Sequence, residues 1–206
     1  MSQTKSSRDL LLEQIASEGY NVGYSASLHF ATLDIASKVP TMVTVTSFAV
    51  GILGLVYPQF AEKLPSAILL IIGICMLYVR DYESRLGEYE QTGIKLNNLY
   101  KQLHDLVVDV KSVAAPSVTQ LDAFRQRLIE VRTAASGLNV SPQIFGASWK
   151  AHHRFFWVID SSWVGEHRNR KFSWRDKAPL SAFVLLGLVV LALLATGLHL
   201  ARSGIC

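Results

Sequence analysis

Hydroxyl side chains are the first residues whose spacing could support a function. Thr41, Thr44 and Ser47 recur every three residues within an uncharged stretch, which places them on one face of a helix. If several copies assembled, this face could line a water-filled path. It could equally hydrogen-bond to a neighbouring helix or simply tolerate lipid. Spacing alone leaves these three interpretations open.

Aromatic rings mixed with positive charge form a second candidate group within residues 137–177. Stacking surfaces beside guanidinium groups can bind nucleotides. The same composition is typical of the headgroup region beside a membrane span, and we favour that interpretation. No nucleic-acid partner is expected. The candidate ligand or lipid contacts are Trp149, Arg154, Arg168, Arg170, Lys171 and Arg175.

The sequence shows no recognisable catalytic arrangement. It has no phosphate-binding glycine loop, no nucleophile elbow and no H-E-x-x-H helix. His152, His153 and His167 could ligate a metal, but solvated or interfacial histidines are the favoured interpretation. We therefore expect no enzymatic activity, no catalytic residues, no metal and no cofactor.

Three apolar stretches indicate an integral membrane protein. Only 17% of the 206 residues are charged, against roughly 25% in soluble domains. Residues 39–57 and 178–201 carry no charge, and a shorter uncharged run at 65–79 extends to a span over 64–82. A span needs about 20 apolar residues. The short connection between the first two spans predicts an antiparallel transmembrane hairpin, and 178–201 predicts a third, C-terminal transmembrane helix.

The basic residues predict the orientation of the chain. Lys63 is the only basic residue between the first two spans, whereas Arg80 and Arg85 follow the second, and a basic run precedes the third. Positive charge is retained on the cytoplasmic side. We therefore expect a multi-pass protein of the inner or plasma membrane, with residues 1–38 and 80–177 cytoplasmic and the C-terminus outside.

The charged part of the chain predicts helices. Residues 1–38 carry a helical stripe that leads into the first span, although Gly19 and Gly23 leave the start of that helix open. Residues 83–136 predict two helices separated by the break at 114–117, and the first of them could continue the second span as one rod. Its apolar seam includes Leu86, Tyr89, Leu96, Tyr100, Leu103 and Val107.

This pattern predicts an all-α membrane protein with a cytoplasmic helical bundle or coiled coil. Packing within the chain is the favoured role of the seam, and contact between copies remains an alternative. Residues 137–177 form the aromatic-basic juxtamembrane segment between the bundle and the third span.

The order of elements from Tyr20 to Lys111 resembles the SLATT family of SMODS- and SLOG-associating two-transmembrane effectors. An N-terminal helix with Tyr20, Tyr24 and His29 leads into a span at Val39. A short turn and a second span follow, and then a long amphipathic helix that opens Arg80-Asp-Tyr-Glu-Ser-Arg85. The aromatic-basic segment and the third span lie outside the part of the chain that carries this resemblance.

The resemblance implies a membrane effector of a bacterial conflict or antiphage system. Such an effector would form a homo-oligomer and permeabilise the inner membrane when triggered. Besides membrane lipids, its implied partner is a nucleotide-second-messenger synthase or sensor protein encoded nearby. The alternative is a non-conducting membrane scaffold or sensor that anchors a cytoplasmic partner.

Overall fold

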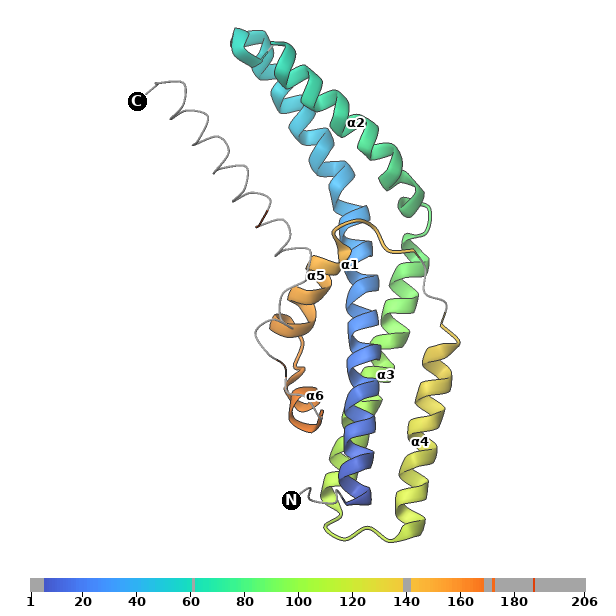
Figure 1. Cartoon of the computed structure of the whole chain (residues 1–206). Coiled ribbons are helices and arrows are strands. Elements are labelled where there is room, and N and C mark those ends of the chain that lie inside the picture. The colour runs from blue at the N-terminus through green and yellow to red at the C-terminus, as the bar shows by residue number, and fades with distance from the viewer. Residues whose placement is uncertain (1–5, 61, 139–141, 169–171, 173–186, 188–206) are drawn as a thin grey trace, which may run out of the picture.

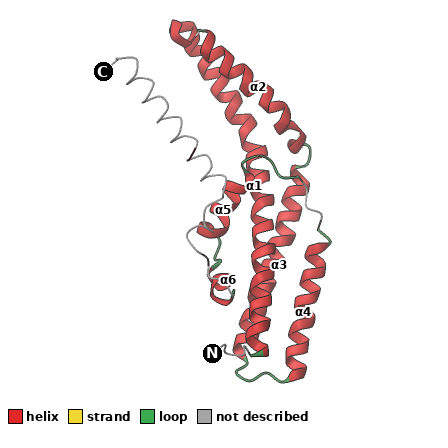
Figure 2. Cartoon of the chain, viewed as in Figure 1, coloured by secondary structure: helices red, strands yellow, loops and turns green. Residues whose placement is uncertain are grey.

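The computed structural model of the chain describes residues 6–60, 62–138, 142–168, 172 and 187. Every element assigned among these residues is a helix, which confirms the all-α prediction (Figure 2). The predicted third span at 178–201 lies outside the described residues apart from one position. The elements are α1 (Ser7–Val56), η1 (Pro58–Phe60), α2 (Lys63–Glu83), α3 (Leu86–Ser112), α4 (Val118–Ser136), α5 (Ala147–His153), the π-helical turn η2 (Arg154–Val158) and α6 (Ser162–His167).

Helix α1 is a single helix of 50 residues, about 75 Å long at 1.5 Å per residue. It begins with a capping box, in which Asp9 N donates to Ser6 Oγ at 3.2 Å and Ser6 N donates to Asp9 Oδ2 at 3.3 Å. Pro40 lies inside the helix and cannot donate a backbone hydrogen bond. Above this region α1 leans away from the axis of its lower part (Figure 1). The predicted boundary at residue 38 therefore falls within one continuous helix.

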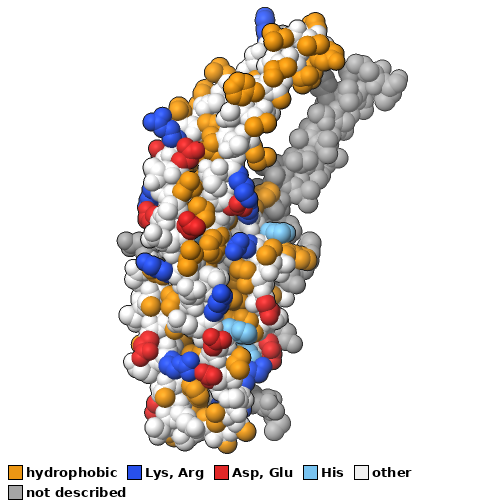
Figure 3. All heavy atoms as spheres, turned by 180° about the vertical axis from the view of Figure 1, so that it is seen from behind, with side chains coloured by type: hydrophobic (Ala, Val, Ile, Leu, Met, Phe, Trp, Pro, Cys, Tyr) orange, Lys and Arg blue, Asp and Glu red, His pale blue; other side chains and the backbone are white. Residues whose placement is uncertain are grey.

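Helix α2 turns back along the upper half of α1 and packs against it (Figure 1). Half-buried residues recur at three- and four-residue steps on both facing surfaces: Val43, Ser47 and Val50 on α1, and Leu69, Ile72 and Met76 on α2. The remaining apolar side chains point outward. In the most apolar 18-residue stretch of α1, no residue is buried inside the protein. In the corresponding stretch of α2, only 6% of the residues are buried. Hydrophobic side chains cover this upper end, whereas charge lies over the lower part and at the tip (Figure 3).

The continuation of α2 into α3 as one rod is a prediction that the structure contradicts. The helix is interrupted at Ser84 and Arg85, where Arg85 N donates to Tyr82 O at 3.1 Å, a spacing of three residues rather than four. Ser84 Oγ also donates to Asp81 O at 2.9 Å, a side-chain bond that competes with regular helix bonding. Gly87 follows directly and favours helix poorly. The break allows α3 to take a direction of its own.

The lower part of the molecule is a bundle in which α3 and α4 pack with the lower half of α1. The seam of α3 is buried within the chain, since Tyr89, Leu103 and Val110 are each fully covered. Leu86, at the upper end of the seam, is only half-buried. Helix α4 begins with a Ser117–Gln120 capping box after the predicted break and contributes Leu121, Leu128 and Val131 to the same core.

The segment from α5 to α6 covers the side of α1 opposite α4 (Figure 1). Its bulky rings, together with that of Tyr100 of α3, fit against positions of α1 that carry no side chain. A Cβ at Gly19 would lie 2.3 Å from Trp163, and one at Gly23 would lie 2.7 Å from Tyr100 and 2.8 Å from Phe155. Gly19 and Gly23 therefore do not mark the start of a helix. They lie inside α1 and admit aromatic rings.

Replacing Gly23 by alanine should destabilise the bundle, although alanine favours helix by about 1 kcal/mol. The added methyl group meets two rigid, buried rings, and overpacking of this kind costs about 1–3 kcal/mol. Thermal unfolding of the detergent-solubilised protein, followed by circular dichroism, should give a lower midpoint for Gly23→Ala.

Gly87→Ala is the matched control, because nothing lies within 4 Å of a Cβ at this position of α3. Its midpoint should equal or exceed that of the unmodified protein. Equal midpoints for Gly23→Ala and Gly87→Ala would contradict the fit of the rings against α1.

Candidate functional site

Three tyrosines at the base of the exposed apolar helices contact one loop, and we call Tyr78, Tyr82 and Tyr89 the tyrosine collar. The Tyr89 hydroxyl donates to Pro142 O at 2.5 Å, and the Tyr82 hydroxyl donates to Gln143 O at 3.4 Å. The Tyr78 hydroxyl accepts from Phe145 N at 3.3 Å and lies 2.9 Å from the Tyr82 hydroxyl. The collar thus ties the loop before α5 to both α2 and α3.

The same loop is anchored to α1. Thr32 Oγ1 donates to Gln143 Oε1 at 2.6 Å. Ile144 is only 4% exposed and packs in a cluster that contains Ala36 of α1 and Val79 of α2. The loop therefore crosses the junction at which the bundle meets the apolar helices (Figure 1), and it contacts both of those helices there.

A charge cluster fixes α5 beside this junction. Asp34 of α1 pairs with Lys150 of α5, and it also lies 2.6 Å from Lys38. Hydrogen bonds from Lys150 and then from Lys38 hold the pKa of the Asp34 carboxyl below its ordinary value of 3.8. Asp34 thus remains ionised and bridges the two helices at neutral pH.

The predicted lipid or ligand contacts are divided between the protein interior and its surface. The Arg154 guanidinium lies 4.5 Å from the centre of the Phe30 ring, and that of Arg168 lies 4.5 Å from the Tyr20 ring. Both arginines therefore attach the α5–α6 segment to α1 through cation–π contacts. Trp149 is 40% exposed. Arg170, Lys171 and Arg175 lie outside the described residues.

Only two of the three hydroxyl residues in the predicted stripe are exposed on the surface of α1. Thr41 and Thr44 are exposed, whereas Ser47 is half-buried on the side of α1 that faces α2. The Thr44 hydroxyl donates to Pro40 O at 2.9 Å. Because a hydroxyl oxygen carries two lone pairs, Thr44 keeps its ability to accept a hydrogen bond from water.

The histidines considered as metal ligands have other contacts. His152 Nδ1 lies 2.7 Å from the Tyr24 hydroxyl. Burial, and then the nearby Tyr20, raise the pKa of Tyr24 to about 12, so this hydroxyl stays protonated. Within the part of the chain that the structure describes, no three His, Cys, Asp or Glu side chains are grouped to hold a metal ion.

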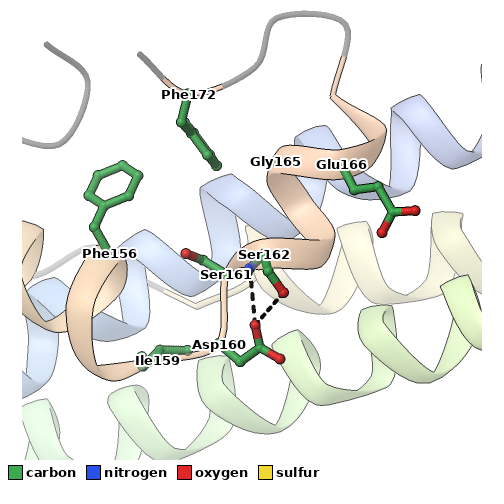
Figure 4. Close-up of a pocket in the computed structure, with 8 residues that line it drawn as sticks. All are labelled: Phe156, Ile159, Asp160, Ser161, Ser162, Gly165, Glu166 and Phe172. Carbon is green, nitrogen blue, oxygen red and sulfur yellow. Dashed lines mark hydrogen bonds between the residues drawn. The ribbon is translucent and has the colours of Figure 1, made fainter. Parts of the chain in front are cut away.

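A pocket with a volume of about 610 Å³ lies where η2 and α6 meet (Figure 4). Phe156 and Phe172 project toward it from one side. Asp160 accepts hydrogen bonds from Ser162 N at 3.1 Å and Ser162 Oγ at 2.5 Å. These bonds lower the pKa of the Asp160 carboxyl. Asp160 thus accepts a hydrogen bond from the backbone N–H of Ser162, the first residue of the short helix α6.

Sequence reasoning missed the loop and most of its partners. Tyr78, Thr32 and Gln143 were assigned no role, and Tyr89 was placed only in a packing seam. A tyrosine in an apolar helix near a membrane surface is ordinarily an interfacial anchor. The sequence carries no local signal that the hydroxyl of such a tyrosine contacts a distant loop. Tyr82 and Gln143, for example, are 61 residues apart.

Comparison with known protein families identifies a family whose model covers most of the chain. The model of the family described as SMODS and SLOG-associating 2TM effector domain 6 matches residues 6–186. This match extends well beyond residues 20–111 and includes the α5–α6 segment. No curated protein and no solved structure matches the chain.

Removing the Tyr89 hydroxyl should loosen the loop from the bundle. Tyr89→Phe deletes the bond to Pro142 O, a loss of about 1 kcal/mol, which should raise the opening rate of the loop about fivefold. Hydrogen–deuterium exchange of peptides that cover residues 142–151 should report this change.

Tyr57→Phe, at the far end of the apolar helices, serves as the control and should leave exchange in this loop unchanged. Identical exchange in Tyr89→Phe and Tyr57→Phe would show that the collar does not hold the loop.

The Asp34 cluster should contribute to stability in a pH-dependent way. Since the folded-state pKa is lowered, the contribution is present above pH 3.8 and is lost as the pH falls through the lowered pKa. Asp34→Asn should therefore lower the free energy of unfolding at pH 7. The decrease should be less than about 1 kcal/mol, because these ion pairs lie at the protein surface. The difference should disappear toward about pH 2.

Asp105→Asn, on the exposed face of α3, provides the comparison and should show no such dependence. A difference between Asp34→Asn and the unmodified protein that persists unchanged at low pH would contradict the assignment.

Proposed function

The chain belongs to the family of SMODS- and SLOG-associating two-transmembrane effectors, and we propose that it permeabilises the bacterial inner membrane when a signalling partner activates it. Effectors of this family are associated with conflict and defence systems. The proposal concerns how this chain would act: by inserting two helices, by assembling with other copies and by responding to a cytoplasmic signal.

The observation that carries the proposal is the exposed apolar surface of α1 and α2. Phe48, Leu55 and Leu70 are between 67% and 87% exposed, and none of the residues that the structure describes covers them. Burying such side chains is worth about 1.5–3 kcal/mol each. A surface of this size in water would drive aggregation, whereas in lipid it is the expected surface of a membrane hairpin.

The distribution of charge supports an orientation. The face of the bundle drawn in Figure 3 carries Lys, Arg, Asp and Glu, and Arg80 and Arg85 lie where α2 meets the bundle. The positive-inside rule then assigns the N-terminus and residues 80–177 to the cytoplasm. Residues 178–201 would form a third span that leaves the C-terminus outside.

Two hydroxyls on the exposed face of α1 are suited to line an aqueous path. Thr41 and Thr44 are exposed on α1, so an assembly of several copies could turn them toward a common axis. Ser47, on the flank toward α2, would lie at the edge of this path. The α3 seam is occupied within the chain, so contacts between copies would involve other surfaces.

The tyrosine collar offers a route for the signal. It connects the base of the apolar hairpin to the loop before α5, and α5 and α6 lie along the cytoplasmic half of α1. A partner that moved this segment would change the contacts at the hairpin base. We propose a nucleotide-second-messenger synthase or sensor encoded nearby as that partner.

The pore assignment is tested by removing hydroxyls. The double variant Thr41→Val, Thr44→Val keeps side-chain volume but removes two water-binding groups, each worth about 1 kcal/mol. It should reduce ion flux from dye-loaded vesicles about tenfold or more. In cells, a voltage-sensitive dye should show the same loss of depolarisation after induction.

Thr46→Val is the matched control, since this exposed threonine lies on a different face of α1. It should conduct like the unmodified protein. Equal loss in both variants would remove the pore-lining assignment. A membrane potential that the unmodified protein leaves intact, together with a partner bound by the cytoplasmic region, would favour a non-conducting scaffold.

A further inference from the structure

A small cleft opens at the break between α2 and α3, on the outer side of the tyrosine collar. Its volume is about 210 Å³, and it is lined by Tyr78, Asp81, Tyr82, Arg85, Tyr89 and Pro142. This volume is below the range of roughly 300–1,000 Å³ that is typical of small-molecule sites. The cleft therefore suits a compact polar group rather than a whole nucleotide.

The cleft lies at the boundary of the exposed apolar surface. Ile74 and Leu77, within two turns before it on α2, are 59% and 65% exposed, and Tyr78 itself is 48% exposed. With α2 in the membrane, the cleft is at the level of the cytoplasmic headgroups. A molecule whose polar end entered it would keep an apolar end against α2.

Two of the lining residues, Asp81 and Arg85, carry opposite charges and are four residues apart in the chain. Asp81 supplies a carboxylate, and the hydroxyls of Tyr78 and Tyr82, 2.9 Å from each other, supply further oxygen atoms that accept hydrogen bonds. Tyr82 and Tyr89 stack with ring centres 6.3 Å apart, and tyrosine faces attract cations. This end of the cleft is suited to a primary ammonium group.

A guanidinium forms the other end. The Arg85 side chain is held by Glu88, with Nε and Nη2 donating at 2.8 and 2.9 Å, and lies 5.9 Å from the centre of the Tyr89 ring. Its side chain is nevertheless 40% exposed. Guanidinium groups recognise phosphate. A phosphate on this side and an ammonium on the other match a zwitterionic headgroup.

We propose that this cleft binds the headgroup of an aminophospholipid, with its ammonium at Asp81 and its phosphate at Arg85. The inference rests on the proposed placement of α2 in the membrane. A lipid without an ammonium group would leave Asp81 facing its phosphate, so an anionic lipid fits less well. Because the bound headgroup would contact the collar, the lipid composition would influence how firmly the loop at 142–145 is held.

The test uses the full chain reconstituted in nanodiscs that contain equal amounts of phosphatidylethanolamine, phosphatidylcholine and phosphatidylglycerol. After mild delipidation, native mass spectrometry measures the lipids that remain bound. We expect phosphatidylethanolamine to be enriched over phosphatidylglycerol on the order of tenfold, the factor for one charge-assisted hydrogen bond. Asp81→Asn should lose this enrichment.

Glu83→Gln is the control, because Glu83 is exposed on the same helix but does not line the cleft. It should keep the enrichment. Equal retention of the three lipids, equal losses in the two variants, or equal binding of phosphatidylcholine, whose ammonium has no N–H to donate, would overturn the proposal.

Resistance of the reconstituted chain to alkaline extraction separates this proposal from the function on which it rests. A chain that stays in the membrane but shows no lipid preference refutes the headgroup site alone. A chain that is extracted from all lipids refutes the membrane placement of α2, and the headgroup site with it.

Discussion

Helix α1 lies in two environments, and the rest of the fold accommodates this constraint. Its first half presents small residues to the bundle, including Ala16, Gly19 and Ala26, which are fully or almost fully buried. Its second half presents apolar side chains that no described part of the chain covers. One backbone therefore connects a buried core to an exposed apolar surface, and every helix from α2 to α6 contacts it.

The close approach of aromatic rings to α1 explains why the α5–α6 segment is part of the bundle. Gly19 and Gly23 leave grooves that Trp163, Tyr100 and Phe155 fill. Arg154 and Arg168 add cation–π contacts to neighbouring rings of α1. Much of the composition that resembles a headgroup anchor therefore stabilises the protein interior. This agrees with a family match that includes the segment.

The junction between the bundle and the apolar helices combines hydrogen bonds with apolar packing. Tyrosine hydroxyls and Thr32 meet polar atoms of the loop at 142–145, while Ile144 alone inserts into the apolar cluster. Single hydrogen bonds contribute about 1 kcal/mol.

The amino-acid sequence by itself determined several elements of this protein, because their signals are local. Uncharged runs predicted the two apolar helices, the three-and-four spacing predicted the α3 seam, and residues 114–117 predicted the break before α4. The family resemblance followed from the order of these elements.

Only the tertiary structure decided what the elements contact. The orientation of Ser47 toward α2 and the insertion of Trp163 at Gly19 depend on neighbours that are not adjacent in the chain. The same holds for the bond between Tyr89 and Pro142, which are 53 residues apart, and for that between Tyr24 and His152, which are 128 apart. Periodicity records which face of a helix is buried, but not which distant atoms bury it.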